Sequence, residues 1–195
     1  MASHQASFAE VLSPRSWECL LLLLRDADPG VFEYALWALG NISMQPEGAK
    51  AAVSVGILIR FPEILESSHK ELRSSACRLL GIIAQHEPTS VPVLATNPCS
   101  HLVLLLRDSD TIVIQNSLFA LWNISEWPDG AQAALDVEIL NLIPELLDSP
   151  DVDIRRPASY LLDKIARHNS PILNTFPVHR LLSLLRCVWR PTNIE

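Results

Sequence analysis

Two pairs of side chains in this sequence have residue types and a spacing that could bind a polypeptide. Trp37 and Asn41 lie four residues apart, and Phe119 and Asn123 repeat that spacing further along the chain. Residues four apart lie on one face of a helix, so each pair would present an aromatic ring beside an amide. An amide offers the donor and the acceptor that a peptide unit needs, and an aromatic ring offers an apolar wall that attracts cations. The residue types are therefore chemically suited to contact with a polypeptide.

The positions equivalent to these pairs in two other segments hold different residue types. Arg78 and Ile82 stand in one segment, and Tyr160 and Lys164 in the other, so neither has the complete pair. Side chains in the same columns would set which polypeptide side chains are accepted. The predicted partner-binding residues are Glu33, Trp37, Asn41, Arg78, Gln115, Phe119, Asn123 and Tyr160. The alternative is that these side chains only pack between helices or stabilise helix ends.

Motifs typical of enzymes and metal sites do not occur in the sequence. None of the six histidines belongs to H-E-x-x-H, and there is no P-loop and no G-x-G-x-x-G. The four cysteines form no C-x-x-C pair and have no zinc-like spacing to a histidine. We therefore expect a non-catalytic protein with no cofactor and no metal.

An internal repeat of 41 residues explains why the aromatic–amide pair occurs twice. Leu39 aligns with Leu80, Leu121 and Leu162, and no gap is needed across four copies. Three further columns are equally regular: Ile42, Ile83, Ile124 and Ile165; Leu24, Leu65, Leu106 and Leu147; and Ala35, Ala76, Ser117 and Ala158. A fixed period of this length indicates an array of stacked supersecondary units.

Each copy has the periodicity of helices. Val31, Ala35, Leu39 and Ile42 recur at spacings of three and four, which places them on one helical face. Shorter helices are expected around Phe61 to Leu65 and after the prolines at 46 and 128. The long helices would stack side by side, so that their exposed columns form ladders along a concave surface.

A column of aspartates marks where the long helices begin. Asp28, Asp110 and Asp151 occupy this column, and a proline follows Asp28 at the first helical position. His69 replaces the aspartate in the second copy. These residues predict N-caps for three of the four long helices.

The sequence thus predicts an all-α fold, a right-handed α-solenoid of about four three-helix repeats in a single domain. The predicted divisions are a partial helix region at 1–17, repeats at 18–58, 59–99, 100–140 and 141–181, a partial fifth repeat at 182–190, and a tail at 191–195. The copies also alternate. The first and third share R-D-x-D, at residues 25–28 and 107–110, which suggests that a two-repeat unit was duplicated.

The stretch from Leu58 to Ala84, LIRFPEILESSHKELRSSACRLLGIIA, resembles the armadillo repeat. HEAT repeats, which have two helices, are the near alternative. Trp37 and Asn41 are similar to the W-x-x-x-N motif of importin-α-like armadillo proteins. This resemblance implies that the asparagine amide binds the backbone of an extended peptide and that indoles hold its side-chain stems. Several glycines of the family are replaced, because Asn97, Glu138 and His179 stand in the column of Gly56.

Charge is distributed unevenly along the chain, whose net charge is −7. Up to Ile154 there are 20 acidic and 8 basic residues, whereas Arg155 to Arg190 holds seven basic residues and one acidic residue. An acidic surface favours a basic partner segment and makes nonspecific nucleic-acid binding a poor expectation, and we expect no specific nucleic-acid partner. The alternative is a solvated acidic surface that only keeps the protein soluble. The basic end could also dock on the acidic start of another copy.

The apolar run from Cys19 to Leu24 is much shorter than the roughly 20 residues of a membrane-spanning helix, and it predicts a buried helix segment. No secretion signal follows Met1, so we expect an intracellular protein, cytoplasmic or nuclear. The predicted function is a scaffold or adaptor that binds an extended polypeptide along the concave surface. The alternative is a structural unit that associates through its ends or lateral faces.

Overall fold

The computed structural model describes residues 14–169, and the regular structure within that range is entirely helical. The elements are α2 (Pro14–Leu23), α3 (Pro29–Ser43), α4 (Pro46–Ser54), η1 (Ile57–Arg60), α5 (Phe61–Leu65), α6 (Lys70–Ala84), α7 (Glu87–Leu94), α8 (Pro98–Leu105), α9 (Thr111–Ile124), α10 (Pro128–Asp136), η2 (Ile139–Asn141), α11 (Ile143–Leu147) and α12 (Val152–His168). The predicted all-α fold is confirmed.

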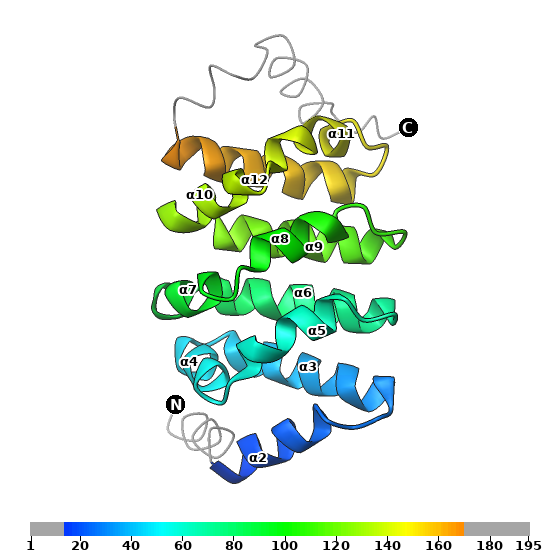
Figure 1. Ribbon diagram of the computed structural model, residues 1–195, viewed down its shortest axis with the longest axis vertical. Helices are drawn as coiled ribbons and strands as arrows, with labels where there is room; N and C mark the ends of the chain where they lie inside the picture. The colour runs from blue at the N-terminus through cyan, green and yellow to red at the C-terminus, as the bar shows by residue number, and fades with distance from the viewer. Residues whose placement is uncertain (1–13, 170–195) are drawn as a thin grey trace, which may run out of the picture.

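Four long helices, α3, α6, α9 and α12, stack one above the other in chain order (Figure 1). The short helices α4, α7 and α10 form a second column at one side of the stack, and α5, α8 and α11 form a third column in front of the long helices. Each repeat therefore contributes one helix to each of three columns, and contacts run mainly between neighbouring repeats. This is the architecture of an α-solenoid.

The aligned columns of the sequence form the hydrophobic core. Leu39, Leu80 and Leu121 are each no more than 1% exposed, and Leu162 is also buried. The columns headed by Leu24 and Ala35 are buried in all four repeats, and Ile42 is the one partly exposed member of its column. Stacking one repeat on the next removes these side chains from water, which supplies the main driving force for the fold.

The aspartate column caps the long helices as predicted. The Asp28 side chain accepts hydrogen bonds from the backbone of Gly30 and Val31, at 2.8 and 3.2 Å. Asp110 does the same at the start of α9, and Asp151 accepts from one backbone N–H of α12. His69 makes no side-chain cap at the start of α6.

The column of Gly56 keeps a left-handed backbone even where glycine is replaced. Gly56 has a φ of 83°, and the equivalent residues Asn97 and Glu138 have φ values of 50° and 58°. These residues end one short helix and begin the next, so the turn requires this conformation. The loss of the family glycine therefore leaves the turn unchanged at both positions. His179, the fourth replacement, lies outside the described residues.

A series of equivalent hydrogen bonds links the C-terminal ends of the long helices to the following repeats. A side-chain N–H from one repeat donates to a backbone oxygen near the end of the preceding long helix. The three contacts are His86 Nε2 to Ser43 O, Trp127 Nε1 to Ala84 O and His168 Nε2 to Glu126 O, each 2.9 Å long. These bonds satisfy oxygens that the helices themselves leave unpaired. His86 and His168 are therefore structural links between repeats.

The junction between α6 and α9 carries a bidentate ion pair. Arg73 donates from Nε and Nη2 to the two carboxylate oxygens of Asp108, at 2.7 and 3.0 Å. Arg73 Nη1 also donates to the backbone oxygen of Ser67 at 2.8 Å, and Asp108 Oδ1 accepts from the backbone of Asp110 at 2.9 Å. The two charged side chains are 15% and 7% exposed, so the pair is shielded from solvent and strongly oriented.

The expected burial of the run Cys19 to Leu24 needs correction, and the predicted repeat boundaries stay untested. The run Cys19 to Leu24 lies mostly in α2, yet Leu22 and Leu23 are 64% and 42% exposed while only Leu24 is fully buried. The run is therefore not a buried helix segment along its whole length. The repeat boundaries stay predictions, and the partial fifth repeat and the tail lie outside the described residues. No helix within residues 14–169 is long and apolar enough to span a bilayer.

Candidate functional site

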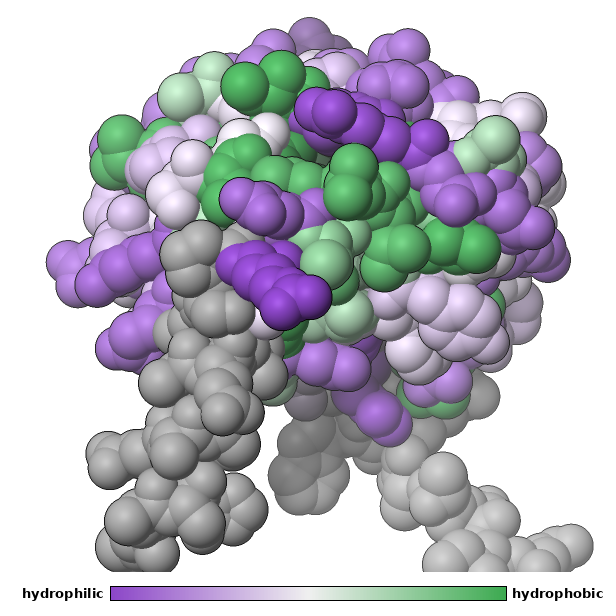
Figure 2. Space-filling model, turned by 90° about the horizontal axis from the view of Figure 1, so that it is seen from below, coloured by the Kyte–Doolittle hydropathy of each residue, from purple (hydrophilic) through white to green (hydrophobic). Residues whose placement is uncertain are grey.

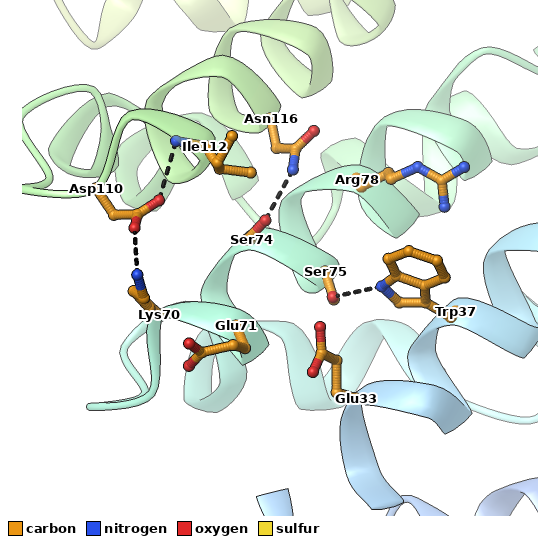
Figure 3. Close-up of a pocket in the computed structure, with 10 residues that line it drawn as sticks. All are labelled: Glu33, Trp37, Lys70, Glu71, Ser74, Ser75, Arg78, Asp110, Ile112 and Asn116. Atoms are coloured by element: carbon orange, nitrogen blue, oxygen red, sulfur yellow. Dashed lines mark hydrogen bonds and ion pairs between the residues drawn. The ribbon is translucent and has the colours of Figure 1, made fainter. Parts of the chain in front are cut away.

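A pocket of about 270 Å³ opens between the N-terminal halves of α3, α6 and α9. We call it the acidic pocket. It is lined by Glu33, Trp37, Lys70, Glu71, Ser74, Ser75, Arg78, Asp110, Ile112 and Asn116 (Figure 3). Two predicted binding residues of the first repeat, Glu33 and Trp37, thus line it together with Arg78 of the second repeat.

The wall beside Trp37 is held in place by the next repeat. The indole Nε1 donates to the hydroxyl of Ser75 at 3.0 Å, and the guanidinium of Arg78 lies 5.7 Å from the ring centroid (Figure 3). Trp37 nevertheless keeps 50% of its surface exposed. An oriented and half-exposed indole presents a flat apolar surface at little cost in side-chain entropy.

Acidic side chains dominate the charge of the pocket. Asp110 pairs with Lys70 through a hydrogen bond of 2.8 Å, whereas neither Glu33 nor Glu71 forms an ion pair in the described part of the chain. Two carboxylates therefore remain available at the pocket, against one further cation, Arg78. A pocket with this balance attracts a positively charged group.

The Lys70–Asp110 pair fixes one edge of the pocket. Its hydrogen bond raises the pKa of Lys70 and lowers the pKa of Asp110, so both side chains stay charged at neutral pH. Asp110 also caps α9 through Oδ1, so a single carboxylate joins the start of α9 to the start of α6 (Figure 3). The pocket edge is thus built from helix-capping geometry rather than from a flexible loop.

An aromatic cluster lies on α9 and α12, outside the residues that line the acidic pocket. Phe119 and Trp122 meet edge to face with ring centroids 6.2 Å apart, and Trp122 lies 5.5 Å from Tyr160. Tyr160 is 47% exposed, and the other two rings are half-buried. We call these three residues the aromatic cluster. The cluster provides an apolar platform on α9 and α12, whereas the carboxylates of Glu33 and Glu71 lie on α3 and α6.

The two predicted asparagines differ in their surroundings. Asn123 donates its Nδ2 to the backbone oxygen of Phe119 at 2.9 Å, within its own helix. Asn41 is exposed, and its amide forms no hydrogen bond with any residue in the 14–169 range. Only Asn41 therefore presents both a free donor and a free acceptor. Ile82, in the same column, is only 2% exposed, so this column does not run as an open ladder along the surface.

The remaining predicted residue, Gln115, is half-buried on α9 and lies outside the pocket lining. Sequence reasoning missed the residues from the first turns of α6 and α9, among them Lys70, Glu71 and Asp110. The alignment of the repeats contained a signal for Glu71. Ser74 is the equivalent of Glu33, and Glu71 lies three residues before Ser74 on the same helical face. Asn116 donates to Ser74 at 2.8 Å and closes this side of the pocket.

The cysteines within residues 14–169 supply no reactive group to this surface. Burial raises the pKa of Cys77 and of Cys99 to about 12 in each case. A thiol that stays protonated is a poor nucleophile and a poor metal ligand. Cys19 is exposed but lies on α2, which contributes no residue to the pocket lining.

The structure resembles several solved helical repeat proteins, and no protein-family model matches the sequence. An engineered protein superposes with a TM-score of 0.84 at 26% identity, over 97% of this chain and 77% of the other. A designed armadillo repeat protein in complex with the peptide (KR)4 gives a TM-score of 0.85 at 22% identity, over 96% and 80% of the two chains. The fold is an armadillo-like solenoid.

A third solved structure extends the comparison. Computationally designed armadillo repeat proteins for modular peptide recognition match with a TM-score of 0.69 at 24% identity, over 74% of this chain and 62% of the other. At these identities the likeness shows the fold alone. Within this armadillo-like solenoid, the acidic pocket and the aromatic cluster both lie on the long helices that the predicted ladders occupy.

Proposed function

We propose that this armadillo-like chain is a non-catalytic scaffold that binds an extended, basic polypeptide segment along its long helices. The observation that carries the proposal is the acidic pocket, which is lined by the half-exposed ring of Trp37 and by the carboxylates of Glu33 and Glu71, neither of which forms an ion pair within residues 14–169. A lysine or arginine side chain has both a cationic head and an apolar stem. Carboxylates suit the first and an indole suits the second.

The surrounding residues give such a segment a place to continue. Asn41 offers a free amide to a peptide backbone, and the aromatic cluster offers an apolar platform further along the stack. A designed armadillo repeat protein of the same fold was solved with a peptide of alternating lysine and arginine, which supports a basic ligand of this type. The intracellular location expected from the sequence is part of the same proposal.

The test is a binding titration with a fluorescently labelled (KR)4 peptide, followed by fluorescence anisotropy. Glu33→Gln and Glu71→Gln each remove one charge with little change in shape. We expect each to weaken binding roughly 3- to 10-fold, with a smaller dependence on salt concentration. Trp37→Ala should weaken binding by a similar or larger factor.

The matched control is Glu47→Gln, which removes an exposed carboxylate on α4, outside the pocket. Its affinity should equal that of the original chain. The proposal fails if (KR)4 does not bind at millimolar concentration, or if Glu47→Gln weakens binding as much as the two pocket variants. In the second case, attraction would come from overall charge instead of the pocket.

A further inference from the structure

Exposed side chains of the described solenoid gather in more than one place. Figure 2 shows apolar side chains gathered at the α2 end of the stack, where the described residues begin and where Leu22 is 64% exposed. Nothing within residues 14–169 indicates what covers that surface. The acidic pocket, in contrast, lies between α3, α6 and α9, and each of these helices is described over its whole length. The balance of charges in the pocket therefore identifies a ligand more closely.

Arg78 lines the acidic pocket without a carboxylate partner. Its guanidinium lies 5.7 Å from the centroid of the Trp37 ring, and it forms no ion pair and no hydrogen bond with any residue in the range 14–169. Arg73 on the same helix differs, because Asp108 binds it through two hydrogen bonds of 2.7 and 3.0 Å. The N–H donors of Arg78 are therefore available to a ligand, whereas those of Arg73 are occupied.

The contact with the indole holds Arg78 in place without using these donors. A cation is attracted to the face of an aromatic ring by its charge, and a guanidinium keeps its five N–H groups in its own plane. Trp37 is itself held, because its Nε1 donates to the hydroxyl of Ser75 at 3.0 Å. Paired N–H groups in one plane match the two oxygens of a carboxylate. Arg78 thus presents an oriented binding group for a carboxylate.

The unpaired carboxylates of the pocket and Arg78 lie on different sides of Trp37. Glu71 and Arg78 are seven residues apart on α6, which is two turns, so they share one helical face and are separated by about 10 Å along the helix axis. Figure 3 shows Glu33 on one side of the indole and the guanidinium of Arg78 on the other. The pocket therefore has a negative side toward the N-terminal ends of the long helices and a positive side toward their middle.

An extended polypeptide meets such a surface with neighbouring residues. Successive side chains of an extended chain point in opposite directions. When a segment crosses the long helices, as in the proposed function, one side chain points toward Glu33 and Glu71 and the next points toward Arg78. A lysine or arginine suits the first direction, and it would be repelled by the like charge in the second. An acidic side chain suits the second direction.

We propose that the acidic pocket selects a segment in which a lysine or arginine stands directly beside an aspartate or glutamate, whose carboxylate binds Arg78. This inference rests on the proposed function and narrows its ligand from a basic segment to one with adjacent opposite charges. A carboxylate suits the pocket better than a phosphate group, because Glu33 and Glu71 repel a group with nearly two negative charges more strongly. Arg78 is then the residue that determines specificity.

Fluorescence anisotropy with three labelled peptides of equal length tests the proposal. The peptide (KE)4 has the alternating charges, (KQ)4 has the lysines without the acids, and (KR)4 tests the proposed function. Arg78→Gln removes the guanidinium. We expect this variant to weaken (KE)4 binding roughly 3- to 10-fold, because the peptide carboxylate loses its partner. Binding of (KQ)4 should stay unchanged or become tighter, because Arg78 no longer repels the lysines.

The different responses of (KE)4 and (KQ)4 separate ligand recognition from a structural role. If Arg78→Gln acted only by displacing Trp37, both peptides would lose affinity together. Arg78→Lys keeps the charge but loses the paired donors, so it should retain only part of the affinity for (KE)4. Arg107→Gln is the matched control, since it removes an exposed arginine outside the pocket lining. Its affinity for (KE)4 should equal that of the original chain.

Three results would overturn the proposal. They are a (KE)4 affinity that Arg78→Gln does not lower, an equal loss for (KQ)4 in that variant, and an equal loss for (KE)4 in Arg107→Gln. Absence of (KE)4 binding at millimolar concentration, while (KR)4 binds, would also overturn it and would leave the proposed function with a purely basic ligand. Absence of (KR)4 binding would instead overturn the proposed function, and this inference with it.

Discussion

The indole Nε1 of Trp127 donates to the backbone oxygen of Ala84 across 2.9 Å, joining the loop after α9 to the end of α6. This hydrogen bond gives a partner to a backbone oxygen that would otherwise be unpaired at the end of a helix. It belongs to a ladder in which His86 and His168 make the same type of contact in other repeats. Polar bonds between repeats thus supplement the apolar core of the solenoid.

We expect Trp127→Phe to lower the free energy of unfolding by about 1–2 kcal/mol, because it keeps most of the ring but removes the only N–H of the side chain. Urea denaturation followed by circular dichroism measures this value. Trp122→Phe is the matched control, since Trp122 contacts Phe119 and Tyr160 through its ring and forms no side-chain hydrogen bond within the described residues. A larger loss for Trp122→Phe would contradict the prediction.

The Arg73–Asp108 pair should make the stability of the solenoid depend on pH in the acid range. Burial raises the pKa of Asp108, but hydrogen bonds from Arg73 and from the backbone of Asp110 outweigh it and hold the pKa below its usual range. The folded chain therefore binds a proton on Asp108 less readily than the unfolded chain does. Its stabilising contribution is complete above about pH 4 and is lost as the pH falls through the lower, folded value.

Urea midpoints measured from pH 6 down to pH 2 test this expectation. Asp108→Asn should lower stability at pH 6 by about 2–4 kcal/mol, because Arg73 would lose its charged partner in a shielded site. It should also lose less stability on acidification than the original chain. An unchanged acid dependence in Asp108→Asn would show that other carboxylates are responsible.

Two equivalent glycines should respond oppositely to the same substitution. A Cβ on Gly81 would lie 2.7 Å from ring atoms of Phe119 and 3.0 Å from Cα of Ala120, whereas a Cβ on Gly40 would meet only Ile82 and Arg78 side chains at 3.5 and 3.6 Å. We expect Gly81→Ala to destabilise the fold by about 1–3 kcal/mol, since backbone cannot move aside easily. Gly40→Ala should be neutral or stabilising by up to about 1 kcal/mol, because alanine favours helix.

Thermal unfolding of the two variants, followed by circular dichroism at one concentration, gives the comparison. If Gly40→Ala were the more damaging of the two, the packing of Phe119 on α6 would not be the reason for glycine at position 81. The displacement of Phe119 would also disturb the aromatic cluster, so Gly81→Ala provides a second, indirect variant for the peptide titration.

Glu138 holds a left-handed backbone, with a φ of 58°, that most side chains avoid. Glu138→Gly should raise the free energy of unfolding by about 0.5–1 kcal/mol, because relief of the steric cost exceeds the entropy that glycine loses. Asn97→Gly should gain less, since asparagine tolerates this conformation. Urea denaturation of both variants measures the difference, and a loss of stability in Glu138→Gly would oppose the argument.

Much of the fold could be predicted because each repeat buries the same columns. Leu39 and its three equivalents lie in the core, and Asp28, Asp110 and Asp151 cap the helices that the sequence assigned to them. These features depend on local periodicity and capping chemistry, which a single repeat already contains. Four aligned copies made them easy to recognise.

The surface was harder to predict because it depends on how one repeat rotates against the next. Asn41 and Ile82 occupy the same column, yet one is exposed and the other is covered by the preceding repeat. The amide of Asn123 donates to the backbone oxygen of Phe119 in its own helix. The position of Asn123 in the aligned columns does not determine this side-chain orientation. The acidic pocket arises from three helices of three repeats, so no single repeat reveals it.

The alternation between repeats also implies a spacing rule for a bound segment. Two repeats beyond Glu33 and Trp37 the same columns hold Gln115 and Phe119, so the charged surface gives way to a neutral and aromatic one. Neighbouring packed helices lie about 10 Å apart, so these two places are separated by roughly 20 Å. An extended chain advances about 3.3 Å per residue, which corresponds to roughly six residues. A ligand matched to this molecule would therefore carry a lysine or arginine at one position and an apolar or uncharged side chain about six residues away.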